Sequence, residues 1–73
     1  MSFYDDLVEV SKEYFGFGSV LFVNRVLREM SVSKDSLKKS DIPKFVGLID
    51  KLAKTSLKPE RKAQFKKDVL ALQ

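Results

Sequence analysis

Cysteine, histidine and tryptophan are absent from this chain of 73 residues, which contains only three glycines and two prolines. Without cysteine there is no disulfide, no thiolate metal site and no thiol nucleophile. Without histidine the chain lacks the commonest general base and the commonest zinc ligand. The sequence therefore argues against an enzyme, a bound metal, a cofactor or a small-molecule substrate, and it favours a protein that works by binding.

Long apolar runs are also absent. No uninterrupted run is longer than Val20–Val23, whereas a membrane-spanning helix needs about 20 apolar residues. Asp5 and Asp6 occupy the region where a secretory signal would be basic and then apolar. We therefore expect a cytoplasmic protein that makes no contact with a membrane.

Hydrophobic residues make up 44% of the chain, and six phenylalanines and two tyrosines are among them. This content is too high for a disordered chain and is enough for one small core. A chain of this length allows one domain, which we expect to span residues 1–73.

Charge is distributed unevenly, although the chain as a whole carries +4. Residues 1–30 hold five acidic and three basic side chains, a net charge of −2, whereas residues 31–73 hold five acidic and eleven basic ones, a net charge of +6. Such asymmetry can steer an anionic partner, or a second copy of the chain, toward the basic half. The alternative is that the lysines only keep a small protein soluble.

The apolar residues recur with the period of an α-helix and nowhere alternate over a stretch long enough for a strand. Clusters of glycine, serine and proline separate four such segments. We therefore predict helices over about 3–15, 19–30, 40–55 and 59–72. Short helices with brief connections predict an all-α fold, a compact bundle of four short helices whose neighbours are mostly antiparallel.

Several local details follow from this pattern. Ser2 and Asp5 have the spacing of a capping box at the start of the first helix. Ser40 is the expected N-cap of the third helix, and Leu37 is expected to plug the loop before it into the core. We expect Phe17 to be tucked into the core within a tight turn and Val20 to lie on the apolar face of the second helix.

Leu21 falls outside the apolar face of the second helix and is expected to point outward, near Arg25 and Arg28. The nearby Gly16-Phe17-Gly18 sequence is no nucleotide-binding loop. A dinucleotide-binding fingerprint follows a strand, whereas a helix precedes this segment, and Leu21 stands where the third glycine would be.

Basic residues cluster in the fourth helix. Four of them flank its apolar stripe and could form a rim that contacts the phosphates of a nucleic acid: Lys58, Arg61, Lys62 and Lys66. No exposed aromatic residue is expected between them, and arginine is scarce where base recognition would need it. A solvated face with no binding role is the alternative interpretation.

Gly47 is predicted to face outward on the third helix, ringed at helical spacing by Lys44, Lys51 and Lys54. A glycine at an exposed position inside a helix costs about 1 kcal/mol relative to alanine. One interpretation is that a partner approaches closely here; the other is that the position is simply not optimised for stability.

Several turn and cap sequences together resemble small helical modules that close some prokaryotic sensory and regulatory proteins. These are Phe15-Gly16-Phe17-Gly18-Ser19 before a helix with Arg25, Asp35-Ser36-Leu37, Ser40-Asp41-Ile42-Pro43, and Pro59-Glu60 at a helix start. The resemblance spans about residues 4–72, and these 73 residues do not include the sensory domain that such modules accompany. It implies association or regulation, and it assigns no functional residue.

Together these observations predict a non-enzymatic interaction or regulatory module. Its partner would be another protein or a second copy of the chain, and the acidic first helix of one copy would contact the basic third or fourth helix of another. The alternative is a small basic protein that binds nucleic acid through its lysine-rich third and fourth helices.

Overall fold

Residues 2–72, which the computed structural model describes, contain only helices as regular structure. The elements are α1 (Phe3–Phe15), η1 (Gly16–Gly18), α2 (Ser19–Met30), η2 (Lys39–Asp41), α3 (Ile42–Leu52) and α4 (Pro59–Leu70), where η denotes a single turn of 3₁₀ helix. No strand occurs in these residues, so the predicted all-α class is confirmed. The first and last residues of the expected domain, 1 and 73, lie outside the described part.

α1 has the two ends that its sequence predicts. The Ser2 hydroxyl accepts a hydrogen bond from the Asp5 backbone N–H (3.2 Å), and the Asp5 carboxylate accepts one from the Ser2 N–H (3.3 Å). This capping box satisfies two N–H groups that the helix itself leaves free. Gly16 ends the helix with a φ of 57°, which other residues rarely adopt.

The prediction for the start of α3 was wrong by about two residues. Ser40 lies within η2, and α3 begins at Ile42 after Asp41, whose side chain caps no helical N–H. Instead, the Asp41 carboxylate accepts a hydrogen bond from the Lys38 N–H at 3.0 Å. This contact closes an extra 3₁₀ turn, so the regular helix starts later than a serine N-cap would place it. α3 ends at Leu52 rather than 55, and α4 ends at Leu70 rather than 72.

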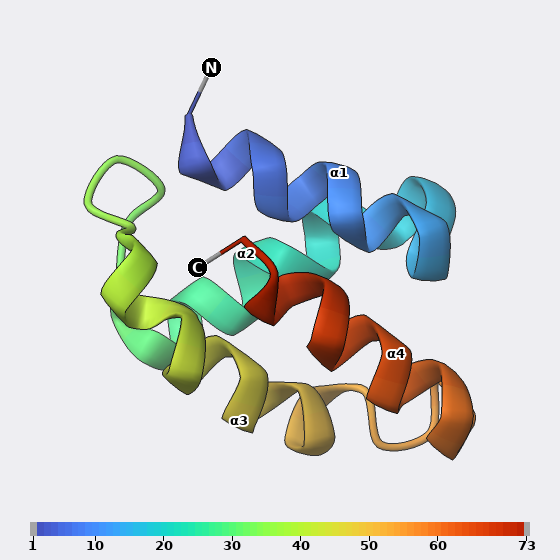
Figure 1. The fold of residues 1–73 in the computed structure, drawn as a ribbon. Helices are drawn as coiled ribbons and strands as arrows, with labels where there is room; N and C mark the ends of the chain where they lie inside the picture. Colours follow the sequence, from blue (N-terminus) through green and yellow to red (C-terminus); the bar gives the residue numbers. More distant parts are fainter. Residues whose placement is uncertain (1, 73) are drawn as a thin grey trace.

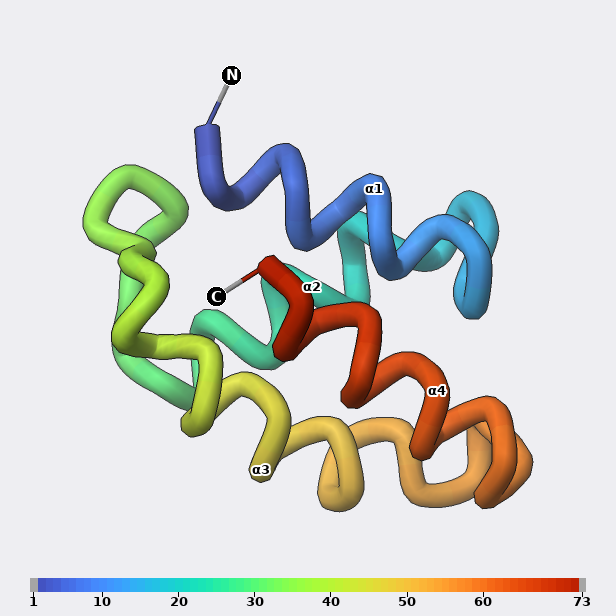
Figure 2. Tube along the Cα trace, in the orientation of Figure 1, coloured from blue at the N-terminus to red at the C-terminus, as the bar shows by residue number. Residues whose placement is uncertain are grey.

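The four helices form a closed ring around the core. α1 packs against α2 and α4, and α3 packs against the same two helices. Figures 1 and 2 show α4 returning alongside α3 in the opposite direction, which brings the last helix back against the first. The molecule is compact, with extents of 30 × 21 × 21 Å.

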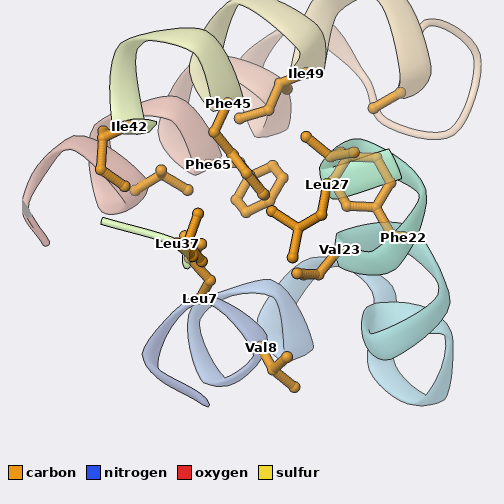
Figure 3. Close-up of a cluster of buried hydrophobic side chains, with 13 residues drawn as sticks. Leu7, Val8, Phe22, Val23, Leu27, Leu37, Ile42, Phe45, Ile49 and Phe65 are labelled. Carbon is orange, nitrogen blue, oxygen red and sulfur yellow. The ribbon is translucent and has the colours of Figure 1, made fainter. Parts of the chain in front are cut away.

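The core receives side chains from all four α-helices and from the connections before and after α3. Phe45 of α3 and Phe65 of α4 are fully buried, and Figure 3 shows them among aliphatic side chains of α1 and α2. Leu37 is also buried, although it belongs to the connection between α2 and α3. Its predicted role as a plug is therefore confirmed.

Candidate interaction surface

Three large apolar side chains lie exposed where η1 meets α2. Phe17 is 106% exposed, Leu21 75% and Val20 44%, and we call these three residues the apolar corner. Figure 1 shows the η1 turn at the edge of the molecule. The outward position of Leu21 is confirmed, whereas the predictions that Phe17 and Val20 are buried were wrong.

The packing of Phe15 and the burial of Ser19 bear on the exposure of Phe17 and Val20. Phe15 stacks on Phe22 with the ring centroids 4.2 Å apart, whereas Phe17, two residues later, makes no such contact and points to the solvent. The buried stripe of α2 starts at Ser19 and continues with Phe22 and Val23. With about 3.6 residues per turn, Val20 lies at the edge of this stripe, in the first turn of α2, and it is left partly exposed.

A hollow of about 390 Å³ adjoins the apolar corner. It is lined by Lys12, Gly16, Phe17, Ser19 and Val20. Gly16 has no heavy atom within 4 Å of where a Cβ would lie. The surface therefore presents a protruding aromatic ring beside a shallow depression.

The charges around the apolar corner differ between its two sides. Lys12 pairs with Glu9 at 2.9 Å on α1. On α2, Arg25 and Arg28 follow Leu21 at helical spacing and are exposed. Neither arginine has an ion-pair or hydrogen-bond partner within residues 2–72. The corner thus has an apolar centre with a polar border on both helices.

The predicted basic rim does not form one continuous free surface. Arg61 donates a hydrogen bond to the Glu13 carbonyl (2.8 Å) and lies over the Tyr14 ring, 4.5 Å from its centroid. Lys66 pairs with Asp50 of α3, where its hydrogen bond lowers the pKa of that carboxyl. These two basic side chains therefore tie α4 to α1 and α3.

The remaining basic residues of the predicted site differ in their exposure and in their ion-pair partners. Lys51 lies 3.8 Å from Glu29 of α2, and both side chains are exposed, so this pair contributes little stability. Lys62 is half-buried, and its charge adds to the lowering of the pKa of Asp50. Three others are exposed and have no ion-pair partner within residues 2–72: Lys44, Lys54 and Lys58.

Gly47 is exposed on α3, as predicted, and a Cβ built there would meet no atom within 4 Å. Its backbone is helical, so nothing among residues 2–72 requires glycine at this position. We expect Gly47→Ala to stabilise the fold by about 1 kcal/mol, because alanine loses less backbone freedom on folding. Thermal unfolding followed by circular dichroism would measure this gain. An unchanged or lower melting temperature would contradict it.

Tyr14 and Asp68 join α1 to α4 beside a second hollow of about 390 Å³. The Tyr14 hydroxyl donates to the Asp68 carboxylate, which also accepts from the Gln64 amide (3.0 Å). Burial, and then the Asp68 carboxylate, raise the pKa of Tyr14 to about 12. The bond from Tyr14, and then that from Gln64, lower the pKa of Asp68. Because these polar groups satisfy one another's hydrogen bonds, the cluster links α1 to α4.

The Tyr14–Asp68 bond predicts an acid-dependent contribution to stability. A carboxyl with a lowered pKa stabilises the fold above its unfolded pKa of 3.8 and loses that contribution as the pH falls through its folded pKa. Tyr14→Phe should cost about 1 kcal/mol at pH 7 and flatten the decline in stability below pH 4. Urea unfolding from pH 7 to pH 2 would test this. Parallel curves for the two proteins would contradict it.

No family model, curated protein or solved structure matches this chain. Among residues 2–72, no group of three or more acidic side chains is placed to hold a metal ion. The described helices are all too short or too polar to cross a membrane. The apolar corner is therefore the feature from which a function is best argued.

The apolar corner was missed at the sequence level because Phe17 is apolar and sits between two glycines. One signal did point to it: Leu21 was recognised as lying off the apolar stripe of its helix. Because Val20 lies at the edge of that stripe, next to the position of Leu27, the helical period alone does not predict its exposure.

Proposed function

We propose that this chain is a non-enzymatic interaction module that binds a protein partner through the apolar corner. The observation that carries the proposal is the complete exposure of Phe17 at the η1 turn. A phenylalanine side chain gains about 1.5–3 kcal/mol when it is removed from water. A binding partner would supply that burial, which the fold itself does not.

The neighbours of Phe17 strengthen this proposal. Scattered exposed apolar residues are ordinary, but Phe17 and Val20 line one hollow, Leu21 directly follows Val20 on α2, and polar residues of both helices border them. An apolar centre within a polar border is the usual anatomy of a protein interface. Large anchors near the centre of such a surface provide most of its binding energy.

Binding of nucleic acid through the basic rim has less support. Arg61 and Lys66 are engaged within the chain, and Lys51 lies near Glu29. The exposed aromatic ring, which could stack on a base, lies at η1 and not among the lysines of α4. The resemblance implies a regulatory role in a prokaryote, and the sequence favours a cytoplasmic location; both belong to the proposal only as the setting of the protein contact.

A photo-crosslinking amino acid placed at position 17 tests the proposal. The variant would be expressed in the organism of origin, with the same amino acid at Leu70 as the control, because Leu70 is exposed on α4 outside the apolar corner. We expect a covalent protein adduct of defined mass from position 17 and not from position 70, and we expect Leu21→Ser to abolish it. Equal yields from the two positions, or an adduct that Leu21→Ser leaves unchanged, would contradict the proposal.

A further inference from the structure

We infer that the apolar corner is occupied by a second copy of this chain, with the Phe17 ring of each copy seated in the hollow of the other. The inference rests on the proposed function, since it names the partner of the same surface. It departs from the expectation that an acidic helix of one copy contacts the basic helices of another. The contact would instead be centred on η1 and would follow a two-fold axis.

The reason is the shape of the surface. A two-fold contact requires a patch that complements itself, so a protrusion and a depression must lie side by side. Phe17 is completely exposed and forms one side of the hollow, whose other sides are formed by Lys12, Gly16, Ser19 and Val20. Rotation about an axis between these two features would place each ring over the other copy's hollow.

Charge supports the same occupant. Two copies of a chain with a charge of +4 repel each other, so they associate most easily through a patch without net charge. Of the described residues that line the hollow, Lys12 alone is charged, and Glu9 pairs with it at 2.9 Å. Arg25 and Arg28 lie roughly 6 and 10 Å farther along α2 than Leu21, at 1.5 Å per residue. The neutral part of the surface therefore coincides with the ring and the hollow.

The size of the patch sets the strength of the contact. Three exposed apolar side chains and their border form a small interface, below the roughly 1,200 Å² that stable specific complexes bury. We therefore expect a weak dimer that exchanges rapidly, detectable at concentrations up to about 1 mM.

Isotope-filtered nuclear Overhauser spectroscopy tests this arrangement on the unmodified chain. In an equimolar mixture of labelled and unlabelled protein, we expect contacts from the Phe17 ring of one chain to the Val20 methyl groups of the other. The filter removes contacts within a chain, so these signals report only the dimer. Their absence at about 1 mM, the upper concentration set above, would overturn the inference.

A substitution that fills the hollow distinguishes insertion of the Phe17 ring into the hollow from non-specific association of apolar surfaces. Val20→Phe enlarges the exposed apolar surface but fills the space that the incoming ring needs. We expect it to weaken dimerisation at least about tenfold in sedimentation velocity. Leu70→Phe is the matched control, because Leu70 and Val20 are both 44% exposed, and it should leave dimerisation unchanged. Stronger dimerisation of Val20→Phe would overturn the inference.

Different results would contradict the interaction module and the second-copy inference. A chain that stays monomeric at every concentration, with a position-17 adduct to a different protein, overturns the second-copy inference and leaves the interaction module intact. A position-17 adduct between two copies supports both. No specific adduct from position 17, together with a monomeric chain, overturns both.

Discussion

Phe65→Ala is expected to unfold the protein. Phe65 is fully buried and is the main anchor of α4, whose only other buried side chain is Val69. Truncation of a buried phenylalanine to alanine costs about 3–5 kcal/mol. A single core in a chain of this size rarely supplies more than about 3–5 kcal/mol in total. The substitution therefore removes most or all of the free energy of folding.

The aromatic contacts of Phe65 explain why its neighbours would not compensate. Its ring centroid lies 4.9 Å from that of Tyr14, 5.6 Å from that of Phe15 and 5.8 Å from that of Phe22. These rings belong to α1 and α2, so Phe65 connects the last helix to the first two. Its loss leaves a cavity between three helices, which a small shift of one side chain does not close.

Circular dichroism at 222 nm with urea titration measures this effect. We expect no cooperative transition for Phe65→Ala at 25 °C. Leu70→Ala on the same helix is the matched control and should lose less than about 1 kcal/mol, because Leu70 is 44% exposed. A cooperative transition for Phe65→Ala, with a loss below about 1.5 kcal/mol, would contradict the account of the core.

The helical spacing of the apolar residues predicts most of the fold. The period of the apolar residues located α1 and α2 to the residue, and the Ser2–Asp5 spacing identified the capping box that starts α1. These features are local, so they can be recognised without knowing what packs against them. The start of α3 is also decided locally, but two caps compete there, and the sequence does not show that the Asp41–Lys38 bond forms in place of the expected serine cap.

The interaction surface was predictable only in part, for a related reason. Phe15 and Phe17 are both aromatic and lie two residues apart, so hydrophobicity alone does not decide which one enters the core. The stacking of Phe15 on Phe22 decides it, and that contact depends on how α1 crosses α2. The internal pairing of Arg61 and Lys66 likewise depends on the approach of α4 to α1 and α3.

Phe17→Ser is expected to weaken association strongly and leave folding intact. The Phe17 side chain is fully exposed and makes none of the aromatic contacts of the core, so its loss should change the free energy of unfolding by no more than about 0.5 kcal/mol. As the proposed central anchor of the interface, its removal should weaken association at least about tenfold. Sedimentation velocity up to about 1 mM would measure the association.

The free energies of unfolding of Phe17→Ser and Phe15→Ser, measured side by side in urea, test most directly whether Phe17 serves binding and not folding. Phe15→Ser should lose at least about 2 kcal/mol, since it removes the ring that stacks on Phe22. Phe17→Ser should unfold at the same urea concentration as the original chain. If Phe17→Ser loses as much stability as Phe15→Ser, the ring belongs to the core, and the apolar corner is not a binding surface.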